Sequence, residues 1–328
     1  MLAKDLSALR LGFNLGQTFD NADKSTDPAR VKPLLKAYRD KGFTHVRIPV
    51  SWRRSDDYFF NKTKFMTDLM TAVQYSVDIG LAVILDAHHE QWLHERYDDS
   101  QAVRDKFKDM WKDIAGKFRT FSPDKLVFEV LNEPQVKFGD TDDCMREPFI
   151  SRTRAINQAG YDGIRSATAT HLVLAMLPGG GVDPCLAVAV HSYTPNAFCL
   201  PSGSNDVFPT VDAVRAFLSD RAAKTRRYSD ASGIYVMMNE FGVGAEDQSR
   251  RGDPRVAAFY YETAKNFLQR GIALSVWDDS GSFAVRDDRG TWVYGLADAM
   301  IKGARDATTA PAASRRRDLA PIIETIDL

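Results

Sequence analysis

Short runs of apolar residues alternate along the chain with longer segments in which apolar residues recur every three or four positions. The short runs are typical of buried strands, and the longer segments have the period of amphipathic helices. The predicted strands are Leu9–Asn14, Thr44–Pro49, Ala82–Ala87, Leu126–Leu131, Leu172–Met176, Leu186–His191, Ile234–Asn239 and Ala273–Trp277. The predicted helices are Ala29–Lys41, Lys64–Ile79, Ala102–Phe121, Ser151–Thr168, Val211–Arg226, Arg255–Gln269 and Gly295–Gly303. This alternation indicates a parallel sheet covered by helices.

Eight strands followed by helices in a chain of 328 residues predict one α/β domain, a single-domain (β/α)8 TIM barrel. The fifth and sixth strands lie close together in sequence, which leaves room for only a stunted helix between them. We expect the catalytic domain to cover residues 1–304. Residues 305–328 are rich in Ala, Thr, Pro and Ser and then basic, so we expect them to form a C-terminal tail or extension.

The carboxyl ends of the predicted strands are the place to search for chemistry, because a TIM barrel carries its catalytic groups there. Seven of the eight strands end in polar or aromatic residues, whereas their interiors are Val, Ile and Leu. The residues at these ends are Asn14, Arg47, His88, His89, Asn132, Glu133, His191, Tyr193, Glu240 and Trp277. Two glutamates, several histidines and an arginine at strand ends indicate an active site.

The fourth and seventh strands both end in Asn-Glu, which gives Glu133 and Glu240. Two carboxylates about 5–5.5 Å apart are typical of retaining glycoside hydrolysis, in which one is the nucleophile and the other the acid/base. The nucleophile must stay ionised, so it needs hydrogen-bond donors nearby. Arg47, His191 and Tyr193 are suitable donors.

Three other chemistries are weaker. The segment "HHEQWLH" could suggest zinc, but His89 and His94 are five apart and follow a strand, unlike the helical zinc motif. The loop "PGGGVDP" lacks the Lys-Ser/Thr of a phosphate-binding loop, and "SGS" at Ser280–Ser282 is a poor start for a serine triad. We therefore expect no metal and no cofactor.

Aromatic residues in the predicted loops have two readings. Trp52 and Trp92 could pack within the protein or stack on sugar rings, and Phe19 and Phe283 are weaker candidates for stacking. Trp111 lies in the middle of a predicted helix and His45 lies early in a strand, so we expect both to be structural.

Composition excludes some classes of partner. The formal net charge of −1 gives no electrostatic footprint for nucleic acid or an anionic membrane, and no apolar run approaches the ~20 residues of a bilayer span. The N-terminus has no signal-peptide pattern.

The chain has three cysteines, Cys144, Cys185 and Cys199. They are too few for a disulfide scaffold, although two of them could form one disulfide.

The motifs together resemble glycoside hydrolase family 5, the family of cellulases and related β-glycanases. The similar segments are "GFNLGQTFD", "GFTHVRIPVSW", "LAVILDAHHE", "VFEVLNEP", "VHSYTP", "MMNEFGV" and "VWDDSGSF". The ending "WDDSGSFAVRDDRGTW" is most similar to endo-β-1,4-glucanases. Two departures concern the substrate: Gln17 stands where the family often has Asn, and "PGGGVDP" lacks an aromatic residue often found there.

The resemblance implies a retaining endo-β-1,4-glucanase, secreted and monomeric, acting on β-1,4-glucan without a cofactor. A cytoplasmic location stays open, as do a relative acting on mannan, xylan or xyloglucan and a silent carbohydrate-binding barrel. By resemblance, Glu133 is the acid/base and Glu240 the nucleophile. The implied roles of the other positions are as follows: Arg47 and Tyr193 hold the nucleophile, His191 lies near the acid/base, Asn132 and His88 bind hydroxyls of one sugar, and Trp277 forms its platform.

Overall fold

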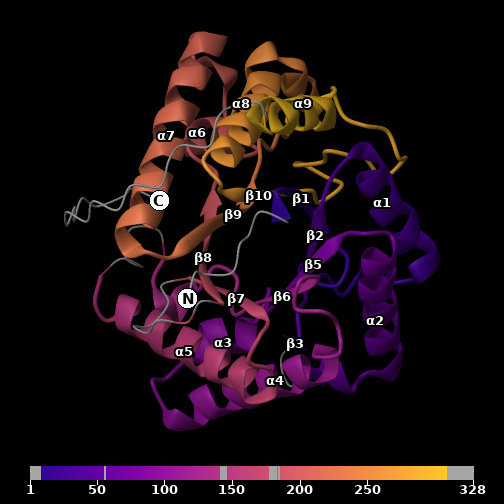
Figure 1. Ribbon diagram of the computed structural model, residues 1–328, viewed down its shortest axis with the longest axis vertical. Coiled ribbons are helices and arrows are strands. Elements are labelled where there is room, and N and C mark those ends of the chain that lie inside the picture. Colours follow the sequence, from indigo (N-terminus) through magenta and orange to yellow (C-terminus); the bar gives the residue numbers. More distant parts are fainter. Residues whose placement is uncertain (1–8, 55–56, 141–145, 177–182, 184, 309–328) are drawn as a thin grey trace. The chain divides into compact units, whose positions relative to one another are not determined.

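The computed structural model of this chain describes residues 9–54, 57–140, 146–176, 183 and 185–308. Eight strands hydrogen-bond in the order β1, β10, β9, β8, β7, β6, β5, β2 and close into a parallel barrel (Figure 1). The strands are β1 Leu11–Asn14, β2 His45–Ile48, β5 Ala82–Asp86, β6 Leu126–Glu129, β7 Leu172–Ala175, β8 Leu186–Ser192, β9 Tyr235–Phe241 and β10 Ala273–Val276. The predicted single-domain (β/α)8 barrel is confirmed.

The helices are α1 Pro28–Lys41, α2 Thr63–Asp78, α3 Gln91–Arg96, α4 Gln101–Phe118, α5 Phe149–Ala167, α6 Asn196–Cys199, α7 Val211–Ser232, α8 Pro254–Gln269 and α9 Leu296–Thr308. A small antiparallel pair, β3 Arg53–Arg54 with β4 Asp57–Tyr58, follows β2. The helices α3 and α6 and the β3–β4 pair were not predicted, because each is too short to show a period in the sequence.

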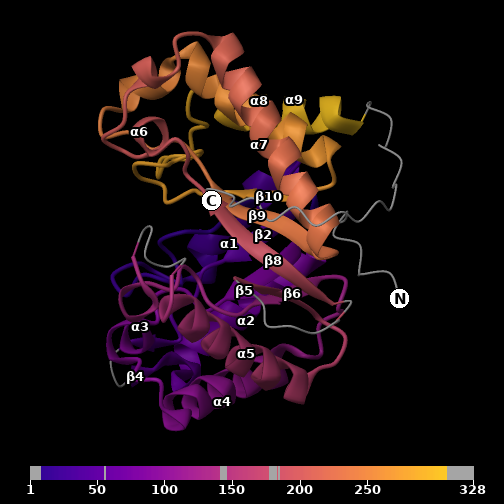
Figure 2. The same ribbon diagram turned by 90° about the vertical axis from the view of Figure 1, so that its left-hand side faces the viewer.

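Contacts between Cα atoms divide the chain into two compact units. The first unit holds residues 17–36 and the described residues between 47 and 189. Within it, β5 pairs with β6, β6 with β7 and β7 with β8, and the register sets Asp86 beside Glu129. Helices α4 and α5 pack against each other in this unit (Figure 2).

The second unit holds the described residues 9–16, 37–46 and 190–308. Within it, β1 pairs with β10 and β10 with β9, so residues from opposite ends of the sequence share one sheet. Helix α8 packs against both α7 and α9. The pairing of β1 with β10 brings Asn14 into the neighbourhood of the last two strands.

Local chemistry explains where the helices begin and end. Ser100 begins α4 by accepting a hydrogen bond from the backbone N–H of Val103, and Asp253 does the same for Arg255 in α8. Helix α7 runs past its predicted end at Arg226 and stops at Gly233, which has a φ of +69°. Glycine adopts this left-handed conformation without a steric penalty, so it ends the helix.

The end of the predicted catalytic domain, residue 304, falls inside α9, which continues to Thr308. Residues 309–328 lie outside the described residues, as does nearly all of "PGGGVDP", where a stunted helix was expected.

Among the residues that the structure describes, no helix combines the length and the apolar character that a bilayer crossing demands.

Candidate active site

The two Asn-Glu pairs end β6 and β9 in different ways. Glu240 lies within β9 itself, because that strand continues to Phe241, past its predicted end. Glu133 lies in the loop after β6 and has a φ of +35°. Few residues other than glycine adopt positive φ, and backbone strain of this kind clusters at functional sites. The strained backbone therefore supports Glu133 as a functional residue.

Glu240 is buried in the second unit and accepts a hydrogen bond from a tyrosine. The Tyr193 hydroxyl donates to Glu240 Oε2 over 2.9 Å, and His191 Nδ1 lies 3.4 Å from the same oxygen. Tyr193 thus contacts the carboxylate that the sequence assigned to it. Within this unit the His191 ring lies against Glu240, and its position near the acid/base stays a prediction of the resemblance. Phe283 packs edge-on to Tyr193, with ring centroids 5.4 Å apart.

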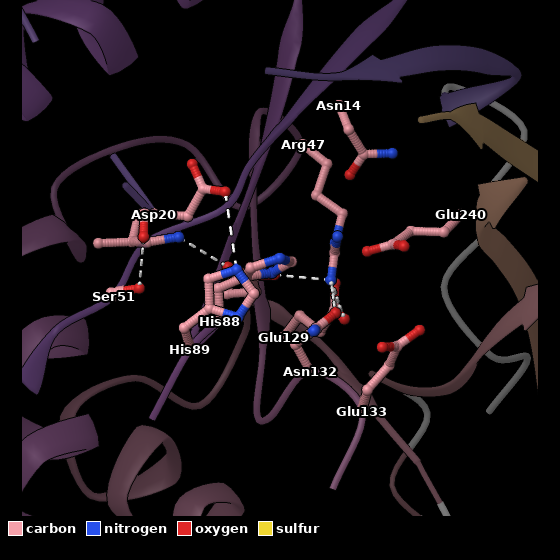
Figure 3. A network of polar contacts seen from close by, with 12 residues as sticks. Asn14, Asp20, Arg47, Ser51, His88, His89, Glu129, Asn132, Glu133 and Glu240 are labelled. Atoms are coloured by element: carbon pink, nitrogen blue, oxygen red, sulfur yellow. Dashed lines mark hydrogen bonds and ion pairs between the residues drawn. The ribbon is translucent and has the colours of Figure 1, made fainter. Parts of the chain in front are cut away.

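Arg47 is fully buried, and Figure 3 shows the side chains of Glu129 and Asn132 next to its guanidinium group. Its Nε donates to Glu129 Oε2 over 2.7 Å, and its Nη2 donates to Glu129 Oε1 over 2.8 Å. Nη2 also donates to Asn132 Oδ1 over 2.9 Å and lies 2.6 Å from Asp86 Oδ2. A buried charge is costly unless it is paired, so the two carboxylates stabilise the guanidinium here.

Asp86 connects Arg47 to His88. Its Oδ2 lies 2.8 Å from His88 Nδ1, and its Oδ1 accepts the backbone N–H of Val50 over 2.9 Å. His88 itself is almost completely buried. One carboxylate therefore fixes the ring of a histidine that the sequence assigned to the substrate site.

Asp20, His88 and His89 form a cluster that could hold a metal ion. Among the described residues of the first unit, each offers one ligand atom, and these atoms lie within 4.8 Å of one another. His89 is half exposed, and its Nε2 lies 4.0 Å from Asp20 Oδ2. His94, the other histidine of "HHEQWLH", lies in α3, and burial lowers its pKa to about 4.

Trp277 follows β10 in the second unit and is partly exposed, as a sugar platform needs to be. Its backbone N–H donates to Phe241 O over 2.8 Å. The next residue, Asp278, is buried and accepts hydrogen bonds from the Tyr38 hydroxyl and from the backbone N–H groups of Ser280 and Arg286. Burial raises the pKa of Asp278 to about 6. These bonds fix the loop that carries Trp277.

Asn14 requires a correction. Its side chain is buried, and its Nδ2 donates to Asn239 O over 3.0 Å and to Val276 O over 3.1 Å. These two carbonyls belong to β9 and to β10. Asn14 therefore ties two strands together, and we withdraw the expectation that it binds substrate.

Trp52 and Trp92 also require correction. Trp52 is 0% exposed, and its indole N–H donates to Asp86 O over 2.7 Å. Trp92 is 6% exposed, its N–H donates to Glu90 Oε2, and the Lys106 ammonium lies 4.5 Å from the centre of its ring. Neither indole has a free face for a sugar ring, so both pack within the protein.

Burial also decides the role of the weaker stacking candidate Phe19 and of the residues that we expected to be structural. Phe19 is fully buried and packs edge-on to Phe65, which removes it as a stacking candidate. Trp111 and His45 are fully buried, which confirms the structural expectation for both. Cys185 and Cys199 are free thiols, and Cys144 lies outside the described residues.

Four buried acidic residues around the site were not predicted from the sequence: Asp86, Glu90, Glu129 and Asp278. Glu90 accepts the backbone N–H of Trp52 and the indole N–H of Trp92, and burial raises its pKa to about 7. A signal existed, because acidic residues in or next to apolar strands are rarely buried without a partner.

An eight-stranded parallel barrel with acidic residues at two strand ends is an architecture shared by many glycoside hydrolases. Comparison with known proteins narrows this class. The family model "Cellulase (glycosyl hydrolase family 5)" matches residues 14–281. The chain therefore belongs to glycoside hydrolase family 5, which makes it a glycosidase and confirms the resemblance of its motifs.

Characterised relatives share about a quarter of their residues with this chain. "Cellulase/esterase CelE" of Acetivibrio thermocellus is 25% identical over 341 residues, which cover 92% of this chain and 41% of that protein. "Endoglucanase A" of Ruminococcus albus is 26% identical over 331 residues, covering 90% and 88%. This chain spans 65% of "Endoglucanase 1" of the same organism.

Solved structures support the fold. A "broad specificity endoglucanase" from Clostridium cellulovorans has a TM-score of 0.77 at 21% identity, covering 91% of this chain and 95% of that one. A structure described as "ZgEngAGH5_4 in complex with a cellotriose" has a TM-score of 0.77 at 23% identity, covering 90% and 96%. A Bacteroides ovatus xyloglucanase has a TM-score of 0.73 at 21% identity, covering 92% and 76%.

Proposed function

We propose that this glycosidase is a retaining endo-β-1,4-glucanase, with Glu240 as nucleophile and Glu133 as acid/base. The main observation in favour is the contact of the Tyr193 hydroxyl with Glu240 Oε2 over 2.9 Å. This hydrogen bond fixes the direction of the carboxylate oxygens. An ionised, oriented carboxylate is what attack on an anomeric carbon requires.

The proposed reaction has two displacements. Glu240 attacks the anomeric carbon while Glu133 gives its proton to the oxygen of the departing sugar, and a covalent glycosyl ester forms on Glu240. Glu133, now ionised, then takes a proton from water, whose oxygen attacks the same carbon and releases Glu240. The anomeric configuration is inverted twice and therefore retained.

The substrate contacts proposed for the cleaved sugar come from three residues. Arg47 holds the Asn132 side chain and Asp86 holds that of His88, so both side chains have fixed orientations. Trp277 offers a partly exposed indole on a loop that Asp278 fixes. Aromatic stacking suits the apolar face of a pyranose ring, and amide or imidazole groups suit its hydroxyls.

The glucan specificity is supported by the names of the relatives, which include several endoglucanases and a structure with cellotriose. The xyloglucanase among the structural neighbours supports the rival substrate class. We propose that the chain acts outside the cell, because a polymeric glucan does not cross a cell membrane. We also propose that it acts as a monomer.

A substrate panel tests the proposal. Reducing-sugar release should be measured on soluble β-1,4-glucan, xyloglucan, mannan and xylan, with the product anomer followed by NMR. Fastest hydrolysis of the glucan with retained configuration is the expected result. Fastest hydrolysis of another polymer would reassign the substrate, an inverted product would overturn the mechanism, and no hydrolysis at all would favour a carbohydrate-binding role.

A further inference from the structure

The contact between Arg47 and Asn132 fixes which way the Asn132 amide points. A guanidinium can only donate hydrogen bonds, so the Asn132 atom 2.9 Å from Arg47 Nη2 has to be the carbonyl oxygen. Its NH2 group must then be directed elsewhere. Asn132 therefore presents a hydrogen-bond donor to any ligand it contacts through that group.

Glu129 is the residue that holds Arg47 in this position. It accepts hydrogen bonds from Nε and Nη2 with two different oxygens, at 2.7 and 2.8 Å, which is a bidentate arrangement. Both side chains are fully buried, so little space is left for another orientation of the guanidinium. Glu129 therefore fixes the plane of the guanidinium and, together with Asp86, keeps Nη2 aimed at Asn132.

Asp86 acts on His88 in a similar way. A carboxylate accepts hydrogen bonds, so the His88 Nδ1 that lies 2.8 Å from Asp86 Oδ2 carries the proton. In the neutral ring, Nε2 is then a hydrogen-bond acceptor. Arg47 Nη2 lies 2.6 Å from the same Asp86 oxygen, so that oxygen contacts both the arginine and the histidine.

We propose that Asp86 and Glu129 are positioning residues that set the hydrogen-bond polarity of the sugar site. Through Arg47, Glu129 makes Asn132 a donor; directly, Asp86 makes His88 an acceptor. The bound sugar must then place the acceptor side of one hydroxyl at Asn132 and the proton of another at His88. This inference rests on the proposed function, because it takes the ligand to be a sugar.

The first test reads the tautomer of His88 without any substrate. Long-range ¹H–¹⁵N NMR on the full-length protein at pH 8, with His88→Gln to assign the signal, distinguishes the two neutral forms. A proton on Nδ1 is expected, and Asp86→Asn should move it to Nε2, because an amide N–H can donate to Nδ1. A proton on Nε2 in the unsubstituted protein would overturn the assignment of His88.

The second test is a double-mutant cycle on kcat/KM for an aryl cellobioside. Glu129→Gln is expected to lower kcat/KM roughly 10–100-fold, as the loss of outer-shell partners does at other sites. If Glu129 acts through Asn132, Glu129→Gln combined with Asn132→Ala should be no slower than Asn132→Ala alone. Losses that multiply would overturn this relation.

Glu262→Gln is the matched control. Glu262 is also buried and bound by an arginine and an amide, with Arg215 Nε and Asn266 Nδ2 each 2.9 Å away, but it lies in α8 and not at a strand end. The Glu262→Gln variant should unfold at a lower temperature than the unsubstituted protein and have the same kcat/KM. If Glu129→Gln does not fold, the tautomer of the unsubstituted protein still decides the role of Asp86. Absence of any glucan hydrolysis would overturn the proposed function and leave the NMR test intact.

Discussion

Glu240 and Glu133 differ in their surroundings, and the difference predicts how each responds to removal. Glu240 accepts the Tyr193 hydroxyl within a strand, whereas Glu133 lies on a strained loop and accepts a hydrogen bond from Gln135. Glu240→Ala should abolish turnover on every substrate, because no glycosyl ester can form. Glu133→Ala should be milder on aryl glycosides whose leaving group needs no proton.

Steady-state rates on aryl glycosides of different leaving-group pKa measure this difference. Azide should restore activity to both variants and give products of opposite anomeric configuration. The same dependence on leaving group and azide in the two variants would contradict the assigned roles.

Gly16 is a residue whose lack of a side chain serves the site. An added Cβ would lie 2.7 Å from Asp278 O and 3.1 Å from the Trp277 indole. Gly16→Ala should therefore displace Trp277, lower kcat, and destabilise the protein by roughly 1–3 kcal/mol, the usual cost of overpacking.

Gly116→Ala is the control for Gly16, because Gly116 lies in α4 with nothing within 4 Å of an added Cβ. It should raise the free energy of unfolding by roughly 0.5–1 kcal/mol, as alanine does in a helix interior. Thermal unfolding and kcat on cello-oligosaccharides measure both variants. Normal kcat in Gly16→Ala would show that the contact with Trp277 has no catalytic role.

Glu90 ties two elements of the first unit together, the segment that leads into β3 and the helix α3. It accepts the backbone N–H of Trp52 over 2.7 Å and that of Arg53 over 3.3 Å, and it accepts the indole N–H of Trp92 in α3. Burial raises its pKa to about 7 from an ordinary value of 4.5. Between these two values the folded protein holds a proton that the unfolded chain has released.

This difference gives a signed prediction. Because the folded state binds more protons, the contribution of Glu90 to stability falls as pH rises from about 4.5 to about 7, by on the order of 3 kcal/mol. Relative to Glu90→Gln, the unsubstituted protein should therefore lose free energy of unfolding between pH 5 and pH 8. Urea unfolding of both proteins at the two pH values measures it. A constant difference would mean that Glu90 has an ordinary pKa.

Glu133 follows β6 and Glu240 lies in β9, and both strands belong to the closed barrel. We predict that the Glu133 and Glu240 carboxyl groups lie roughly 5–5.5 Å apart, the separation of retaining enzymes. A crystal structure would measure it. A separation near 9 Å, with room for a water molecule, would indicate inversion and exclude the covalent step.

The proposed chemistry also predicts the response of the enzyme to metal removal. Two carboxylates supply both the nucleophile and the proton, so EDTA should leave the rate of glucan hydrolysis unchanged. The Asp20, His88 and His89 cluster makes this measurement informative. Loss of activity with EDTA, restored by zinc, would give that cluster a catalytic metal.

The sequence was sufficient for the order of elements, and it also led to the acidic pair that we propose as catalytic. The strands appear as short continuous apolar runs, because both faces of a strand in this barrel are buried, and the main helices appear as periodic apolar patterns, because only one face of each helix is buried. Glu133, Glu240 and Tyr193 are recognisable for a related reason: polar residues that interrupt apolar strands at their carboxyl ends belong to the catalytic face of this fold.

Contacts between distant segments could not be read from the sequence. Trp52 is an aromatic residue in a predicted loop, as a sugar platform would be, but it is buried. Its indole N–H donates to Asp86 and its backbone N–H to Glu90, and both partners lie more than thirty residues away in the sequence. Asn14 binds carbonyls of β9 and β10 only because the first strand pairs with the last. Arg47 meets Glu129 through the neighbouring strands of the barrel. Folding brings such partners together across the sheet, and local sequence patterns do not encode pairing over those separations.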